Sequence, residues 1–362
     1  MLTEEVARAA LAQVAYPGLK RDIVALGLVR SIVIGNGRVH VSLALASPRA
    51  GVPEQLREAI RVALAEAGAI RSEVQILSPE GRAPGREDPW AERDRLPGVR
   101  RIIAVGAGKG GVGKSTVAVN LALSLSATGL RVGILDADIY GPSVPVLVGL
   151  EDGAKRVRMT AQQQILPLVA YGLAVVSFGF FLGEQSPAVW RGPMVSKAVK
   201  QFSKGVVWPD LDVLVVDLPP GTGDVPLSLA QSVVVDGAVV VTTPQRLASL
   251  EAAKAIEMFR KLAVPVLGVV ENMSYAACEC GRRSHPFGQG GGDALREASG
   301  APLLARIAFD EATVADGDAG TPAVIERPDG ETAAAFRSVA GQVLELLGLR
   351  PAAAAAPAEL VG

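Results

Sequence analysis

Residues 108–116 carry the clearest chemical signal in the sequence, because they fit the phosphate-binding template G-x-x-x-x-G-K-[ST]. In such a loop the glycines let backbone N–H groups turn inward around phosphate oxygens. Lys114 would bridge the outer phosphates, and Ser115 would offer its hydroxyl to Mg²⁺. An ordinary glycine-rich turn is the alternative, but it needs neither the lysine nor the hydroxyl. The predicted nucleotide site comprises Gly108, Lys109, Gly110, Gly111, Val112, Gly113, Lys114, Ser115 and Thr116.

Three aspartates follow apolar runs that are expected to be strands. Asp136 and Asp138 come after residues 131–135, and Asp217 closes residues 212–216. Ligands bind at the carboxyl edge of an open parallel sheet, so these carboxylates are expected beside the phosphate loop. There Asp138 would position the attacking water, while Asp136 and Asp217 would support the Mg²⁺. Turn capping is the alternative for either of the first two aspartates taken alone.

Two later features also point to nucleotide chemistry. The loop at residues 219–223 combines two prolines with two glycines, a stiff-then-flexible composition suited to sensing a γ-phosphate. Asn272 follows the apolar run 264–270, and its side-chain amide could read a nucleobase edge because it both donates and accepts hydrogen bonds. A plain asparagine turn is the alternative at that position.

The two cysteines of the chain, Cys278 and Cys280, are separated by one residue. Thiolates favour soft metals and iron-sulfur clusters. A tetrahedral zinc site or a four-iron cluster needs four sulfurs, so a complete site would require a second copy of the chain in a two-fold dimer. Inert thiols are the alternative when the spacing is taken alone.

Composition limits the classes of partner. The 362 residues are 49% hydrophobic and carry 36 basic against 37 acidic side chains, which disfavours nucleic acid and anionic membranes as partners. The first residues lack a basic and then apolar secretory signal, and free thiols fit a reducing compartment, so a cytoplasmic location is expected. The uncharged stretch 161–183 is broken by glycine, proline and polar residues, which predicts a buried strand and a glycine-rich loop.

The alternation of apolar runs and helical periodicity predicts an α/β fold, namely a doubly wound, mostly parallel sheet of the P-loop NTPase type. Continuous apolar runs indicate strands that are buried on both faces. The expected strands are residues 101–105, 131–135, 213–216, 238–241 and 264–270, and the expected helices are residues 114–128, 194–203, 250–262, 292–299 and 332–347.

The chain is expected to divide into a small α+β domain at 1–77, a linker at 78–99, an ATPase domain at 100–350 and a flexible Ala/Pro tail at 351–362. In the small domain, Asn36-Gly37 is a hairpin signal between two alternating strands. The other expected elements there are helices at 4–14 and 53–66 and strands at 31–34, 39–46 and 73–77.

Five segments in this order, KGGVGKST, DADIYGPS, DLPPGTGD, TTPQ and ENMS, closely resemble the Mrp/ApbC family of iron-sulfur cluster carrier ATPases. The likeness covers about residues 100–347, and its phosphate loop is of the deviant Walker A class shared with MinD and ParA ATPases. Residues 4–77 look like the MIP18-like domain that is often fused in front of this ATPase.

The resemblance implies a homodimer with slow ATP hydrolysis, in which Lys109 reaches the partner's nucleotide. Cys278 and Cys280 would bind a bridging 4Fe-4S cluster, received from scaffold proteins and passed to apo-proteins. ATP and Mg²⁺ would be the other cofactors. The family spaces its cysteines as C-x-x-C, whereas Ala277 occupies the first position here. The front domain lacks its frequent cysteine at 46–50, which suggests docking rather than metal ligation.

Two other functions share these motifs. A MinD/ParA-type positioning or partitioning ATPase would need an amphipathic membrane tail or a basic DNA patch, and the Ala/Pro-rich tail and slightly negative charge supply neither. A regulatory ATPase could instead bind zinc through Cys278, Cys280 and His285.

Overall fold

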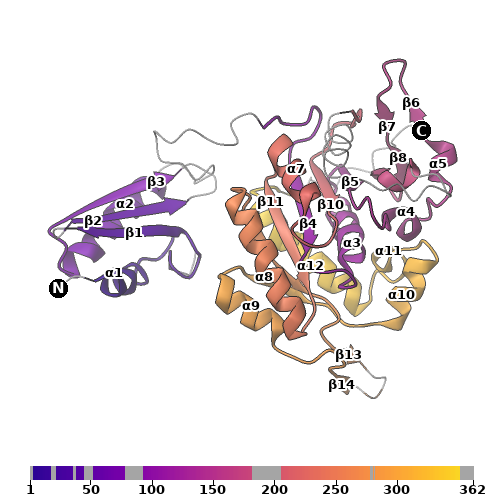
Figure 1. Cartoon of the computed structure of the whole chain (residues 1–362). Coiled ribbons are helices and arrows are strands. Elements are labelled where there is room, and N and C mark those ends of the chain that lie inside the picture. Colours follow the sequence, from indigo (N-terminus) through magenta and orange to yellow (C-terminus); the bar gives the residue numbers. More distant parts are fainter. Residues whose placement is uncertain are drawn as a thin grey trace. The chain divides into compact units, whose positions relative to one another are not determined.

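The structure is a computed structural model that describes residues 3–17, 22–35, 38–44, 52–77, 93–181, 205–277, 280 and 282–350. It contains two compact units, Met1–Pro89 and Trp90–Gly362 (Figure 1). The predicted helix at 194–203, the Asn36-Gly37 turn, Cys278 and the tail at 351–362 lie outside the described residues.

The small unit is a three-stranded sheet covered on one face by two helices. Strand β2 pairs antiparallel with β1 and parallel with β3. The predicted alternation is present, because Val39 and Val41 are buried while His40 between them is exposed. The first helix ends three residues earlier than expected, at Leu11. The elements are α1 (Glu4–Leu11), β1 (Val29–Gly35), β2 (Arg38–Ala44), α2 (Val52–Glu66) and β3 (Arg71–Leu77).

The large unit is built on an eight-stranded sheet with the order β15-β12-β11-β4-β10-β5-β9-β8. All neighbours are parallel except the edge pair of β8 and β9, which confirms the doubly wound, mostly parallel fold. The strands are β4 (Ile102–Ala107), β5 (Val132–Asp136), β8 (Leu168–Ala170), β9 (Leu173–Ser177), β10 (Val213–Asp217), β11 (Gly237–Thr242), β12 (Val266–Glu271) and β15 (Leu303–Arg306).

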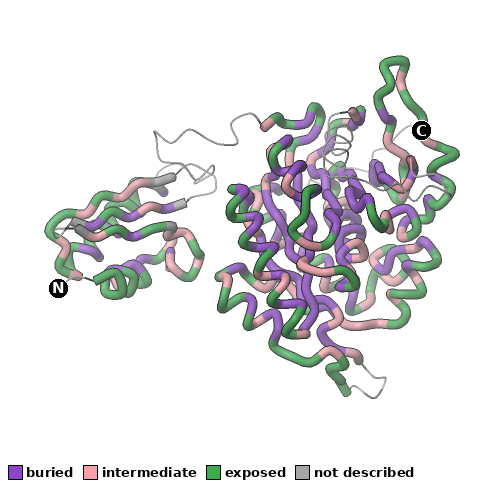
Figure 2. Tube along the Cα trace, viewed as in Figure 1, coloured by how far each residue is buried: buried purple, intermediate pink, exposed green. Residues whose placement is uncertain are grey.

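Helices cover both faces of this sheet, and the buried residues follow its central strands (Figure 2). Along β4, Ile102 and Ala104 belong to the same buried cluster as residues of α7, α8 and α9, whereas Ile103 and Val105 belong to the cluster that contains residues of α3 and α12. This two-sided burial explains why the strands are continuous apolar runs. The helices are α3 (Lys114–Ser126), α7 (Asp224–Ser232), α8 (Arg246–Lys261), α9 (Gly291–Ser299) and α12 (Glu331–Leu346).

Shorter elements complete the unit. The stretch 161–183 contains the buried strand β9, as predicted for that segment. Residues 93–99, which the sequence assigns to the linker, pack on the large unit, where Leu96 and Val99 are buried. In the described part of the chain, every helix is too short or too polar to span a bilayer. The remaining elements are α4 (Val144–Leu147), α5 (Gly153–Arg156), β6 (Arg158–Met159), β7 (Ile165–Leu166), η1 (Phe178–Phe180), β13 (Ala276–Ala277), β14 (Arg283–Ser284), α10 (Glu311–Asp318) and α11 (Ala323–Glu326).

Candidate nucleotide site and thiol hairpin

The phosphate loop, residues 108–113, connects β4 to α3 at the carboxyl edge of the sheet. Gly111 and Gly113 have φ values of 79° and 78°, in the left-handed region that favours glycine. Gly108 is required for a different reason: a Cβ there would overlap the backbone of Glu251 in α8. The glycines thus allow both the turn and a close approach between the loop and a helix from the second half of the domain.

Replacing Gly108 by alanine is expected to destabilise the large unit by about 3 kcal/mol, since helix backbone cannot move aside as a flexible side chain does. Urea unfolding of the purified chain would measure the effect. Gly110→Ala is the matched control, because its Cβ would only touch Pro220 at 3.9 Å. Equal stability of the two variants would contradict the close-approach argument.

Lys114 lies at the centre of the predicted site and is only 7% exposed. Its Nζ is 2.5 Å from Oδ1 of Asp217 and 3.6 Å from Oδ2 of Asp138. It also donates a hydrogen bond of 3.2 Å to Oγ of Ser115. The structure therefore brings together four of the residues that the sequence placed in one site.

Asp136 is fully buried, and its carboxylate is turned toward the protein. It accepts hydrogen bonds from the backbone N–H groups of Asp138 (3.1 Å) and Val144 (3.2 Å) and from the hydroxyl of Ser177 (2.9 Å). These bonds hold the loop that carries Asp138. Sequence reasoning missed Ser177, which lies opposite Asp136 in the pairing of β5 with β9.

Burial governs the protonation of these carboxyls. It raises the pKa of Asp136 to about 7, with a further increase from the charge of Asp217 and an opposing effect of the hydrogen bond from Ser177. Burial also raises the pKa of Asp138 and of Asp217, against the lowering effect of the Lys114 ammonium. Two of these carboxyls, Asp138 and Asp217, lie beside Lys114, so an added cation would relieve the repulsion between them.

The oxygen atoms in this cluster fit Mg²⁺. Oδ2 of Asp217 is buried and accepts no hydrogen bond from the residues that the structure describes. Asp217 and the hydroxyl of Ser115 both lie beside Lys114. Carboxylate and hydroxyl oxygens are hard ligands of the kind that Mg²⁺ prefers, and an unpaired buried carboxylate oxygen is costly without such a partner.

The raised pKa of Asp136 predicts a pH effect on stability. In the unfolded chain this carboxyl ionises near 3.8, whereas in the native state it ionises near 7. Between these values the native state binds more protons, so its contribution to stability falls as pH rises from about 4 to about 7. Urea unfolding of nucleotide-free protein across this range should show a shallower fall for Asp136→Asn than for wild type. Parallel curves would contradict the assignment.

Two other predicted residues contact the loop and its surroundings. Nζ of Lys109 donates to Oε1 of Gln245 at 3.1 Å, at the start of α8. Nδ2 of Asn272 donates to the carbonyl oxygen of Val112 at 2.9 Å, and this asparagine is buried. Asn272 thus supports the phosphate loop from the end of β12, and Gln245 is a contact that sequence reasoning missed.

The described strands on either side of the thiols form a short hairpin, in which Ala277 pairs with Arg283, and Cys280 is exposed. Nδ1 of His285 lies 3.0 Å from the carbonyl oxygen of Ser274, so its imidazole is turned toward the base of the hairpin. Within the described ranges, no three His, Cys, Asp or Glu side chains come together as a metal site.

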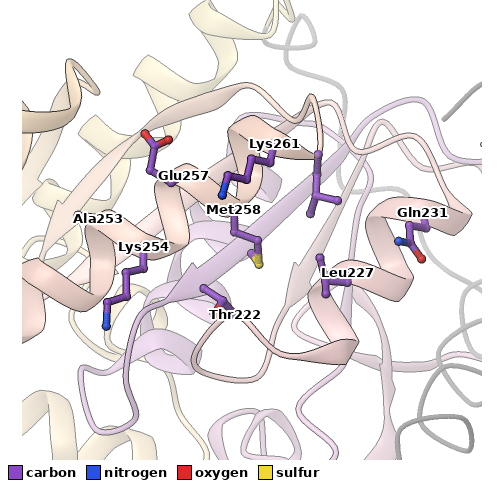
Figure 3. A pocket seen from close by; sticks show the side chains of 9 residues that line it. Thr222, Leu227, Gln231, Ala253, Lys254, Glu257, Met258 and Lys261 are labelled. Carbon is purple, nitrogen blue, oxygen red and sulfur yellow. The ribbon is translucent and has the colours of Figure 1, made fainter. Parts of the chain in front are cut away.

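A separate groove of about 660 Å³ lies between α7 and α8 (Figure 3). Leu227 and Met258 line it together with the charged side chains of Lys254 and Lys261. Thr222, in the loop after Asp217, also contributes to its wall. The phosphate loop does not line this groove, which distinguishes it from the nucleotide site.

Comparison with known proteins places the chain in a family. Residues 98–344 match the family described as NUBPL iron-transfer P-loop NTPase, and residues 4–76 match the iron-sulfur cluster assembly protein family. The iron-sulfur cluster carrier protein of Deinococcus radiodurans is 46% identical over 332 residues, covering 91% of this chain and 92% of that protein. The protein of the same name from Escherichia coli K12 is 42% identical over 341 residues, covering 92% and 89%.

A solved structure agrees with this placement. The nucleotide-binding protein of Archaeoglobus fulgidus, solved in complex with ADP, is 38% identical with a TM-score of 0.57 and covers 66% of this chain and 92% of that chain. The large unit therefore has the P-loop NTPase fold of a nucleotide-binding relative. The chain belongs to the NUBPL-type family of iron-transfer P-loop NTPases, and it carries an iron-sulfur cluster assembly domain at its N-terminal end.

Proposed function

We propose that this protein is an ATP-binding and ATP-hydrolysing iron-sulfur cluster carrier that works as a homodimer in the cytoplasm. The observation that carries the proposal is the convergence of Lys114, Asp138 and Asp217 at the phosphate loop of a chain from an iron-transfer family. The relatives named as cluster carriers, which match over most of the chain, support the same conclusion.

At the nucleotide end, Lys114 would hold the outer phosphates of ATP. Ser115 and Asp217 offer the oxygen ligands for Mg²⁺, which when bound would neutralise charge on the β- and γ-phosphates. Asp138 is the carboxylate that would orient the attacking water. Asp136 would act indirectly. It accepts hydrogen bonds from the backbone of Asp138 and Val144, and these bonds fix the loop that carries the Asp138 carboxylate.

The resemblance to deviant Walker A ATPases assigns Lys109 to the partner's nucleotide. To reach across a dimer, this lysine would exchange its contact with Gln245 for a phosphate oxygen. Asn272 would contribute to nucleotide binding by holding the carbonyl of Val112 and with it the shape of the loop. Transfer of the cluster has no bond-breaking step that ATP hydrolysis must drive. Hydrolysis would therefore be slow and would serve as a switch between states.

The cluster would be cargo, bound by Cys278 and Cys280 from each of two protomers. Four thiolates are the ligand set of a 4Fe-4S cluster, and the exposed position of Cys280 on its hairpin supports a shared site between two copies. Scaffold proteins would supply the cluster, and apo-proteins would receive it. The front domain would dock such partners without ligating metal.

Anaerobic reconstitution tests this function. We expect about four iron and four sulfide per dimer, and activation of an apo-protein that depends on a four-iron cluster. ATP hydrolysis by the same preparation should be slow. Bound zinc without sulfide would overturn the carrier function in favour of a zinc-binding regulatory ATPase, and ATP-dependent binding to vesicles or DNA without cluster uptake would favour a positioning ATPase.

A further inference from the structure

The base of the cysteine hairpin is attached to the body of the large unit by three side chains. The hydroxyl of Tyr275 donates to Oε1 of Glu331 at 2.6 Å, and Nη2 of Arg283 donates to the same oxygen at 2.8 Å. The guanidinium of Arg283 also lies over the Tyr275 ring, 4.1 Å from its centroid. We call Tyr275, Arg283 and Glu331 the hairpin anchor.

Each member of the anchor comes from a different element. Tyr275 precedes β13 and is only 8% exposed, and its carbonyl accepts a 2.6 Å hydrogen bond from the N–H of Phe309. Arg283 begins β14, and Glu331 is the first residue of α12. Since α12 packs on the central sheet, the anchor ties both strands of the hairpin to a fixed part of the fold.

The phenol of Tyr275 keeps its proton at neutral pH. Burial raises its pKa, and the hydrogen bond to Glu331 and the charge of that carboxylate raise it further, while Arg283 lowers it. The tyrosine is therefore a steady donor to a charged acceptor, and hydrogen bonds of that kind are stronger than those between neutral groups.

The described strands of the hairpin are short. Its described pairing consists of Ala276 with Ser284 and Ala277 with Arg283. A two-stranded ribbon of this length is marginal in water. The described contacts between the hairpin and the body of the large unit lie at its base, in the anchor and in the contact between His285 and Ser274.

The same base is directly connected to the nucleotide site. Asn272, three residues before Tyr275, holds the carbonyl of Val112 in the phosphate loop. Between them, the N–H of Ser274 donates to the carbonyl of Ile307 at 2.8 Å. A short, hydrogen-bonded segment therefore runs from the phosphate loop to the anchor.

We infer that Glu331 is a positioning residue for the cluster: through Tyr275 and Arg283 it fixes the hairpin and so determines where the two thiols are presented. The effect of the anchor on cluster binding rests on the proposed carrier function, but the anchoring of the hairpin can be measured without a cluster. Glu331 acts through two other side chains and makes no contact with the cargo in this assignment.

The first test uses the full-length apo-protein. In Glu331→Gln, hydrogen exchange of the backbone amides in residues 276–285 should become about tenfold faster, as expected from losing a charge-assisted network. Tyr275→Phe, which keeps the ring and removes the donor, should change the exchange rate in the same direction. Glu257→Gln is the matched control, because it alters the exposed ion pair with Arg260 on α8.

The second test uses the reconstituted protein. Glu331→Gln should lose iron to a chelator about tenfold faster than wild type and show altered circular dichroism of the cluster, with unchanged ATP affinity. If wild type takes up no cluster, the proposed function fails. The hydrogen-exchange rates of the apo-protein would still test the anchor. If wild type loads, and both anchor variants match Glu257→Gln in hydrogen exchange and iron loss, the anchor is overturned.

Discussion

Replacing Lys114 by alanine is expected to lower the affinity for ATP by at least about 100-fold, which corresponds to about 2.7 kcal/mol. The physical reason is that the buried ammonium directly follows the phosphate loop and would make charge-assisted hydrogen bonds to the outer phosphates. Titration with a fluorescent ATP analogue would measure the loss. Lys254→Ala, which removes an exposed lysine paired with Glu251 on α8, is the control and should bind normally.

The same substitution should also destabilise the chain. Lys114 is the counter-ion of Asp217 and lies near Asp138, and removing one partner of a buried pair typically costs about 3–5 kcal/mol. Burial already raises the pKa of both carboxyls, so the loss should be smaller at low pH, where the carboxyls take up protons and need no counter-ion. Normal ATP binding by a stably folded Lys114→Ala would contradict the site.

The architecture of the large unit could be predicted because its strands are buried on both faces. Such strands appear as unbroken apolar runs, and β4, β5, β10, β11 and β12 all lie within a few residues of the predicted ranges. The short helices α4, α5 and α11 contain four residues each. One helical turn shows no periodicity, so their positions depend on tertiary contacts that no local pattern records.

The aspartates of the site could be predicted because they lie at or just after the ends of strands that are apparent in the sequence. Sequence alone does not give the order of strands in a sheet, and it is this order that places Asp136 directly opposite Asp217 in the pairing of β5 with β10. The contacts of Ser177 and Gln245 join segments far apart in the chain, at 2.9 Å to Asp136 and 3.1 Å to Lys109. Ser177 belongs to none of the quoted motifs, and the TTPQ segment that contains Gln245 does not indicate its contact with Lys109, so only the folded geometry reveals these pairs.

The nucleotide and thiol sites are joined by a short described segment, residues 271–275, rather than by shared ligands. Asn272 contacts the phosphate loop at one end and Tyr275 belongs to the hairpin anchor at the other. None of the described hairpin residues is among the partners of Lys114. Loss of the thiols should therefore leave the nucleotide site in place, which makes the two activities separable.

The double substitution Cys278→Ser and Cys280→Ser is accordingly expected to remove essentially all iron and sulfide from the reconstituted dimer while ATP affinity stays within about twofold of wild type. Serine keeps the size of the side chain, but a hydroxyl loses its proton far less readily than a thiol does. The thiolate is the form that binds iron. Iron and sulfide counts after anaerobic reconstitution, alongside ATP titration of the same sample, would measure both effects.

Ala277→Ser supplies the matched control for this pair, because it adds a hydroxyl to the same hairpin without removing a sulfur. It should load a cluster as wild type does, which separates loss of ligands from disturbance of the hairpin. Unchanged iron content in the double serine variant would show that the cluster is held elsewhere. Loss of both ATP binding and iron would instead show that the thiols stabilise the nucleotide site. The disturbance would then pass from the hairpin to the phosphate loop through the segment that contains Asn272.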